Sequence, residues 1–111
     1  MYRKRQLLAS LSTALTQFPA VLITGPRQSG KTTFLMNELG SEFQYVSLDD
    51  PLSRDFAIQD PNGFLAQFED APVILDEIQY VPDILPYLKI RIDKNRRQFG
   101  QWVLTGSQQF A

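Results

Sequence analysis

The chain has 111 residues, of which 43% are hydrophobic and 21% charged, a composition typical of a globular domain rather than of a disordered segment. Its 11 basic and 12 acidic side chains give a net charge of -1, which argues against nucleic acid or a membrane surface as a partner, because such binders usually carry a basic excess. Without cysteine or histidine, thiol nucleophiles, Ser-His-Asp hydrolysis and Cys- or His-ligated metals are excluded, so any metal must be held by oxygen ligands, for which Mg²⁺ is the natural candidate.

Two features bear on location and domain organisation. The apolar runs are far shorter than the ~20 residues of a membrane-spanning helix, and the N-terminus lacks the apolar stretch of a secretory signal. We therefore expect a cytoplasmic protein without a membrane segment. No repeat, low-complexity tract or linker divides the sequence, so residues 1–111 are expected to form one domain.

The first predicted elements are a helix over residues 2–18 and a strand over residues 20–24. Four leucines share one stripe at helical spacing: Leu7, Leu8, Leu11 and Leu15. Phe18-Pro19 ends the helical pattern. The strand is a short apolar run rich in branched residues, which is typical of a strand buried on both faces.

The middle of the chain repeats this alternation. A helix is predicted over residues 31–39 and a strand over residues 43–48. Residues 52–69 carry weaker helical signals, which the Asp-Pro-Asn-Gly sequence at residues 60–63 interrupts.

Two acidic residues are predicted to cap helices. Asp50 precedes Pro51, which would take the first helical position. Asp83 could cap a helix that runs to about Arg97 and places Pro86 in its first turn, where a missing N–H does little harm.

Two further strands complete the alternation. Residues 73–75 form an apolar run that ends in Asp76 and Glu77, and residues 101–105 form another. Strands that alternate with helices are joined by right-handed crossovers, which bring parallel strands into one sheet. The predicted class is therefore α/β with a mainly parallel sheet.

The strongest motif lies between the first strand and the helix after it. Residues 25–32 match G-x-x-x-x-G-K-[ST] at every fixed position, and a phosphate-binding loop requires this strand-to-helix setting. The expected nucleotide-binding residues are Gly25, Pro26, Arg27, Gln28, Ser29, Gly30, Lys31, Thr32 and Thr33. Backbone N–H groups would face the phosphates, Lys31 would reach the β- and γ-phosphates as a catalytic cation, and the Thr32 hydroxyl would ligate Mg²⁺. The alternative is a glycine-rich turn whose lysine is merely solvated.

Asp76 and Glu77 form the second candidate pair. Open α/β sheets bind ligands at the carboxyl ends of their strands, where these two residues are predicted to lie. We expect Asp76 to hold Mg²⁺ through water or through Thr32. Glu77 is the candidate catalytic base for a water aligned with the γ-phosphate. Without the loop, a helix cap or a plain turn would explain the same two residues.

The end of the fourth strand and some single residues are weaker candidates. Thr105 and Ser107 could hydrogen-bond the terminal phosphate or the attacking water as further catalytic residues, although Thr-Gly-Ser is also an ordinary turn. Gln79 could help to place a water. Arg27 could contact phosphate or a neighbouring acidic group, or simply face solvent. The cations within residues 91–97 are expected to complement a helix dipole, with nucleic-acid contact as a minor alternative.

Four motifs, taken together in this order and spacing, resemble a group of prokaryotic AAA-type P-loop ATPases. They are GPRQSGKTT at residues 25–33, LDDP at residues 48–51, ILDEIQ at residues 74–79 and LTGS at residues 104–107. The resemblance implies that the first contains a Walker A motif, the third a Walker B motif, and the fourth the sensor 1 region.

The resemblance spans essentially the whole chain and implies a fold. It predicts a three-layer P-loop NTPase with strand order 1-4-3-2 and a fifth strand beside the first. Such ATPases normally continue into that strand, a region with an arginine finger or second sensor, and a C-terminal domain. The resemblance therefore leads us to expect that the sequence is the N-terminal core of the family, truncated before the fifth strand.

The expected function is Mg-ATP binding with hydrolysis of the β–γ bond. Two alternatives stay open: a nucleotide-dependent binding module with negligible hydrolysis by this chain alone, and a P-loop small-molecule kinase, although no arginine-bearing lid is evident. GTP is disfavoured because the sequence has no Asn-Lys-x-Asp base-reading motif.

The implied strand order carries an expectation for residues 20–24. Without a fifth strand this apolar segment would lie at a sheet edge, where unpaired N–H and C=O groups invite pairing with another chain. We expect self-association, exchange of an element or marginal stability, unless the N-terminal helix covers the edge.

Overall fold

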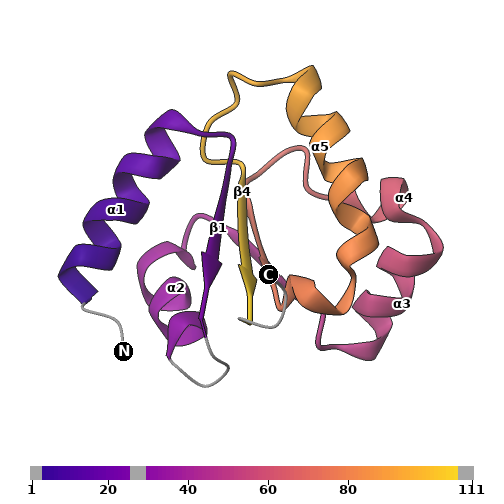
Figure 1. Cartoon of the computed structure of the whole chain (residues 1–111), viewed down its shortest axis with the longest axis horizontal. Coiled ribbons are helices and arrows are strands. Elements are labelled where there is room, and N and C mark those ends of the chain that lie inside the picture. Colours follow the sequence, from indigo (N-terminus) through magenta and orange to yellow (C-terminus); the bar gives the residue numbers. More distant parts are fainter. Residues whose placement is uncertain (1–3, 26–29, 108–111) are drawn as a thin grey trace.

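The protein is an α/β structure with three layers (Figure 1). The computed structural model describes residues 4–25 and 30–107, and the side chains of these residues except 4–7 and 31. The helices are α1 (Lys4–Gln17), α2 (Lys31–Leu39), α3 (Pro51–Gln59), α4 (Pro61–Ala66) and α5 (Leu85–Lys94), with short 3-10 helices η1 (Ile78–Tyr80) and η2 (Pro82–Ile84). The strands are β1 (Ala20–Thr24), β2 (Gln44–Ser47), β3 (Val73–Asp76) and β4 (Trp102–Gly106).

The four strands form one parallel sheet in the order β1-β4-β3-β2. This confirms the predicted class and strand order and is consistent with a P-loop NTPase-like fold. The register pairs Thr24 with Gly106 and Ser47 with Asp76, so all four strands end near one another. No helix in the described part of the chain is both long and apolar enough to cross a membrane.

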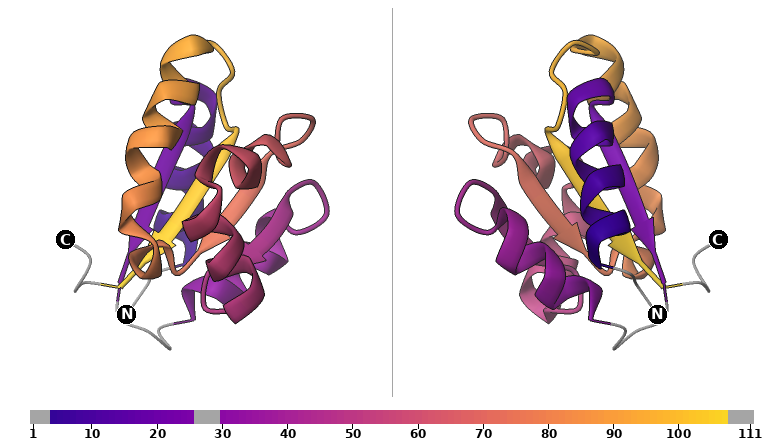
Figure 2. Two further views of the ribbon diagram at one scale, coloured as in Figure 1. Left: turned by 90° about the vertical axis from the view of Figure 1, so that its right-hand side faces the viewer. Right: turned by 90° about the vertical axis from the view of Figure 1, so that its left-hand side faces the viewer.

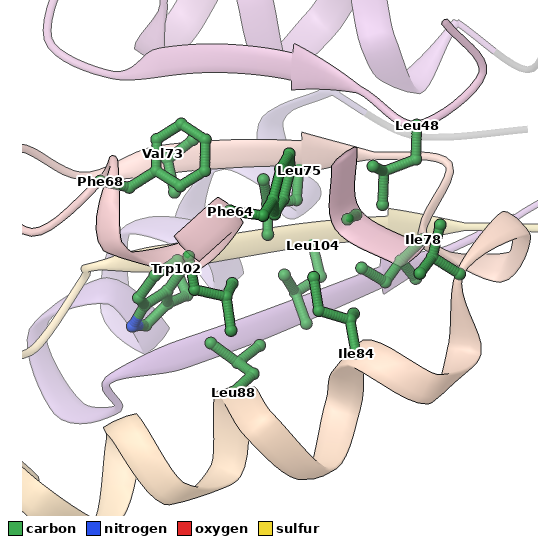
Figure 3. Close-up of a cluster of buried hydrophobic side chains, with 13 residues drawn as sticks. Leu48, Phe64, Phe68, Val73, Leu75, Ile78, Ile84, Leu88, Trp102 and Leu104 are labelled. Atoms are coloured by element: carbon green, nitrogen blue, oxygen red, sulfur yellow. The ribbon is translucent and has the colours of Figure 1, made fainter. Parts of the chain in front are cut away.

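Each face of the sheet buries its own hydrophobic core. α1 and α2 cover one face, while α3, α4 and α5 cover the other (Figures 1 and 2). The larger core lies on the α3–α5 side, where Phe64, Phe68 and Trp102 stack edge to face and Leu88 reaches the sheet from α5 (Figure 3). The smaller core joins Leu11 of α1 and side chains of α2 to residues of β1, β3 and β4.

The predicted cap before α3 is confirmed. The Asp50 carboxylate accepts a hydrogen bond from the Ser53 N–H at 3.1 Å, and Pro51 occupies the first turn. The interruption at residues 60–63 is itself a helix start, because Asp60 accepts from the Gly63 N–H at 3.1 Å and begins α4.

The predicted cap by Asp83 is wrong. Asp83 lies inside η2, and Ile84, which caps α5, makes no side-chain cap bond. The 3-10 turn carries Ile84 into the core, where it is fully buried. Pro86 lies in the first turn of α5 as predicted, but the helix ends at Lys94 rather than near Arg97, because Asn95 leaves the helical conformation.

The prediction that the strand at residues 20–24 is buried on both faces is also wrong. Leu22 of β1 is 48% exposed, because β1 is an edge strand of the described sheet and its faces are only partly covered. In α1, Leu11 is buried and Leu15 packs against the smaller core, but Leu8 is exposed. The helix leans away from the sheet toward its N-terminus (Figure 1).

Candidate functional site

The candidate site lies at the carboxyl ends of the strands, where α2 begins (Figure 1). The Gly25 N–H bonds to the carbonyl of Gly106 at 3.2 Å, which ties the start of the loop to the end of β4. Gly30 has a φ of 89° and caps α2, a left-handed conformation that favours glycine. An added Cβ at Gly30 would meet nothing within 4 Å, so backbone conformation rather than space accounts for this glycine.

Part of the predicted loop falls outside the described residues. This applies to Pro26, Arg27, Gln28 and Ser29, and also to the side chain of Lys31. Thr32 and Thr33 lie in the first turn of α2. Thr33 is exposed, whereas Thr32 is half-buried and turns toward the sheet, where its hydroxyl meets Asp76.

Asp76 is the centre of the site and accepts hydrogen bonds from three hydroxyl groups. Thr32 Oγ1 donates to Oδ2 at 3.0 Å, the Tyr45 hydroxyl donates to the same oxygen at 2.6 Å, and Thr105 Oγ1 donates to Oδ1. The three donors come from α2, β2 and β4, while the acceptor, which is 3% exposed, ends β3. Such charge-assisted bonds stabilise a carboxylate that burial would otherwise destabilise.

The sheet register explains why two of these donors reach Asp76. Tyr45 pairs with Ile74, two residues before Asp76, and side chains two residues apart share one face of a strand. Thr105 lies two residues after Val103, which pairs with Ile74 on the other side of β3. Burial and the neighbouring Asp76 carboxylate raise the pKa of the Tyr45 hydroxyl above its ordinary value, so Tyr45 remains a donor at neutral pH.

Glu77 follows Asp76 in a backbone conformation that few non-glycine residues adopt. Its φ is 60° and its ψ 49°, and its N–H donates to Thr105 Oγ1 at 2.9 Å. Glu77 is almost fully buried. Sparsely populated conformations of this kind cost on the order of 1 kcal/mol or more and concentrate at functional sites.

Gln79 links the Glu77 side chain to the end of β4. Its Nε2 donates to Glu77 Oε1 at 2.7 Å, and its Oε1 accepts from the Ser107 N–H at 3.2 Å. The two bonds fix the orientation of the amide, because each end of Gln79 has a defined partner. One oxygen of Glu77 is thereby engaged.

The structure thus brings together most of the described candidates. Thr32, Asp76, Glu77 and Thr105 form one hydrogen-bonded group, and Ser107 joins it through its backbone N–H. Sequence reasoning missed Tyr45 altogether. A signal was available in the sequence: Tyr45 and Ser47 are polar residues two positions apart on the predicted strand before the acidic pair, so they share one face of that strand.

Two cations near the end of α5, Arg91 and Arg96, have structural partners away from this group. Arg91 pairs with Glu69 and donates to the carbonyl of Asn62. Lys89 and Arg96 both pair with Asp93 and hold the pKa of that carboxyl below its usual range. These contacts favour the structural interpretation of the basic cluster.

The donor set at Asp76 fits a magnesium ion. Because the Thr32 hydroxyl gives its proton to Asp76, its oxygen lone pairs are left for a cation. Mg²⁺ prefers oxygen ligands, retains several waters and is typically held by one or two carboxylates together with substrate phosphates. Thr32 could therefore ligate the ion directly, and Asp76 could hold one of its waters.

A protein-family comparison agrees with this geometry. Residues 17–111 match a family model described as an AAA domain. The chain belongs to this family. Membership indicates a nucleotide-binding AAA-like domain.

The curated relatives of this AAA domain include two mycobacterial proteins without an assigned activity. They are uncharacterized protein Mb2031c of Mycobacterium bovis and uncharacterized protein Rv2008c of Mycobacterium tuberculosis. Each is 34% identical over 95 residues, a match that covers 85% of this chain and 21% of the relative. The chain thus spans about a fifth of the length of these relatives. No solved structure matches it significantly.

Proposed function

We propose that the chain binds ATP with Mg²⁺ and that the bound nucleotide is hydrolysed at the β–γ bond. The observation that supports this most directly is the hydrogen bond of 3.0 Å between Thr32 and Asp76. These residues stand 44 positions apart, at the ends of the two motifs that the sequence assigns to phosphate and metal binding. AAA-family membership is consistent with the same chemistry.

In this proposal, the loop and the start of α2 bind the nucleotide. The motif would supply backbone N–H groups to the phosphates, and Lys31 would bring its charge to the β- and γ-phosphates. The partial positive charge at the N-terminus of α2 adds to this attraction. Bound Mg²⁺ would neutralise charge that develops on the phosphate oxygens. Thr32 and Asp76 would hold and orient the ion.

Glu77 is the proposed general base. Gln79 engages its Oε1, which leaves Oε2 to accept a proton from a water near the γ-phosphate. Thr105 fixes the Glu77 backbone through its hydroxyl and so acts as a positioning residue in the described structure. Ser107 orients Gln79 from the end of β4, which links the base to the sensor-like segment.

A nucleotide-dependent binding module is the second candidate function. The hydrogen bond from Gln79 to Glu77 favours it, because an engaged carboxylate oxygen is a weaker proton acceptor. Phosphate release under saturating Mg-ATP separates the two functions: turnover supports the ATPase, and tight binding without turnover supports the module.

Calorimetric titration with Mg-ATP tests the nucleotide site. Lys31→Ala should abolish binding, because it removes the one cation that the motif places against the phosphates. Lys89→Ala is the matched control, since Lys89 is a lysine of α5 with a 77% exposed side chain, and its ion pair within the described residues is a local one, with Asp93. Equal affinity of the Lys31 variant and the parent would contradict the phosphate-loop assignment.

A further inference from the structure

The Tyr45 hydroxyl is a member of the site that neither phosphate-binding motif contains. It reaches Asp76 Oδ2 from β2, at 2.6 Å, while Thr32 occupies the same oxygen from α2. Nucleotide binding and water activation, as proposed above, need Thr32, Asp76 and Glu77 but assign nothing to this phenol. A short bond to a buried carboxylate nevertheless changes what that carboxylate can offer a metal.

The capacity of Asp76 to accept further bonds is limited. An ionised carboxylate has about four lone-pair positions, two on each oxygen. Thr32 and Tyr45 take both positions on Oδ2, and Thr105 takes one on Oδ1. With the donors that the structure describes, a single position on Oδ1 is left for a metal-bound water, and direct coordination through Oδ2 requires the loss of a donor.

Among the three described donors, Tyr45 is the residue with the largest exposed fraction, although its hydroxyl is partly buried at Asp76. Tyr45 is 36% exposed on edge strand β2, whereas Thr105 is fully buried in β4 and Thr32 is half-buried in the first turn of α2. Removal of the Tyr45 hydroxyl would thus leave Asp76 oriented by the two threonines. Its effect would be to free a position on Oδ2.

We propose that Tyr45 is a positioning residue that competes with Mg²⁺ and its waters for Asp76 Oδ2. The phenol occupies a lone-pair position on Oδ2 that the ion or one of its waters would otherwise take, and it thereby lowers the affinity of the site for the metal. This inference rests on the proposed function, because it requires a metal-dependent nucleotide complex.

Metal affinity in the presence of ADP is the direct test. Mn²⁺ replaces Mg²⁺ as a paramagnetic probe, and its binding to the protein–ADP complex is followed by electron paramagnetic resonance. Tyr45→Phe should bind Mn²⁺ roughly five-fold more tightly, the scale of one hydrogen bond. Its affinity for ADP without metal should equal that of the parent. Tyr87→Phe is the control, since Tyr87 is 38% exposed on α5, across the sheet from the site.

A double-variant comparison tests whether Tyr45 changes the metal affinity through Asp76. Asp76→Asn should bind Mn²⁺ more weakly than the parent, because it removes the carboxylate charge. If Tyr45 acts through Asp76, then Tyr45→Phe should produce no further change in the Asp76→Asn background. A five-fold gain that persists there would overturn the inference.

The remaining outcomes distinguish failure of the Tyr45 inference from failure of the proposed metal-dependent nucleotide binding. If the parent shows metal-dependent ADP binding and Tyr45→Phe has equal or lower metal affinity, the inference is wrong and the proposed function stands. If ADP binds the parent with the same affinity with and without Mn²⁺, the metal site itself is wrong and the inference falls with it. Thermal melts of each variant verify that it is folded.

Discussion

The centre of the sheet and its β1 edge differ in how far their side chains are buried and paired. At the carboxyl ends of β3 and β4, the polar side chains Asp76 and Thr105 are buried and bonded to each other. At β1, Leu22 is 48% exposed beside an apolar groove between α1 and the strand. Among the described residues β1 pairs only with β4, so its outer side carries no strand.

The difference shows which contacts this chain supplies for itself. Polar groups at the centre are satisfied by residues from α2, β2 and β4, although these are far apart in the sequence. The apolar surface of β1 is buried only in part, where Ile23 packs with Leu11 in the smaller core. The site is therefore organised internally, while the edge offers surface to a further strand or another chain.

The largest expected effect is at the centre and concerns catalysis. Glu77→Gln should leave the affinity for Mg-ATP near that of the parent and slow phosphate release by about 10²-fold, because an amide cannot take the proton of the attacking water. Glu38→Gln, an exposed position in α2, should change neither quantity. Hydrolysis by the Glu77 variant at the parent rate would show that another group is the base.

Thr105→Val tests whether the centre depends on its internal bonds. Valine keeps the shape of threonine but leaves the Glu77 N–H without its partner and removes one donor from Asp76. A buried group that loses its partner costs about 1–3 kcal/mol, so the free energy of unfolding should fall by that amount or somewhat more in urea denaturation.

Two further variants sharpen the result for Thr105. Thr105→Ser retains a hydroxyl and should recover most of the lost stability. Thr16→Val removes a hydroxyl with an exposed local partner, the Thr13 carbonyl, and should change the free energy of unfolding by less than about 0.5 kcal/mol. Equal losses for Thr105→Val and Thr16→Val would mean that the central hydrogen bonds add nothing to stability.

Features that depend on neighbouring residues could be predicted from the sequence, and the strand order could be predicted from the family resemblance. The Asp50 cap and the position of Pro86 depend on neighbours within one turn, and both were predicted correctly. Tyr45 was missed because its contact depends on the register between β2 and β3, 31 residues apart in the sequence. The Asp83 cap failed because burial of Ile84 favours a 3-10 turn over a capped helix.

The smallest expected effect on stability is at the β1 edge, where we propose that the chain self-associates. Leu22→Lys places a charge on an exposed position of the edge, a device by which natural sheets oppose pairing between edges. Its free energy of unfolding should stay within about 0.5 kcal/mol of the parent, because little apolar contact is lost. Its apparent mass by light scattering should stay constant with concentration, while that of the parent rises.

Leu52→Lys separates the edge from general surface hydrophobicity. Leu52 is 82% exposed on α3, on the far side of the sheet from α1, so a lysine there should leave the association of the parent unchanged. If both variants reduce association equally, exposed leucines in general are responsible, and β1 has no special role. If the parent is already monomeric over a wide concentration range and unfolds in one cooperative transition, α1 covers the edge sufficiently through Leu11 and Leu15, and the proposal of self-association is wrong.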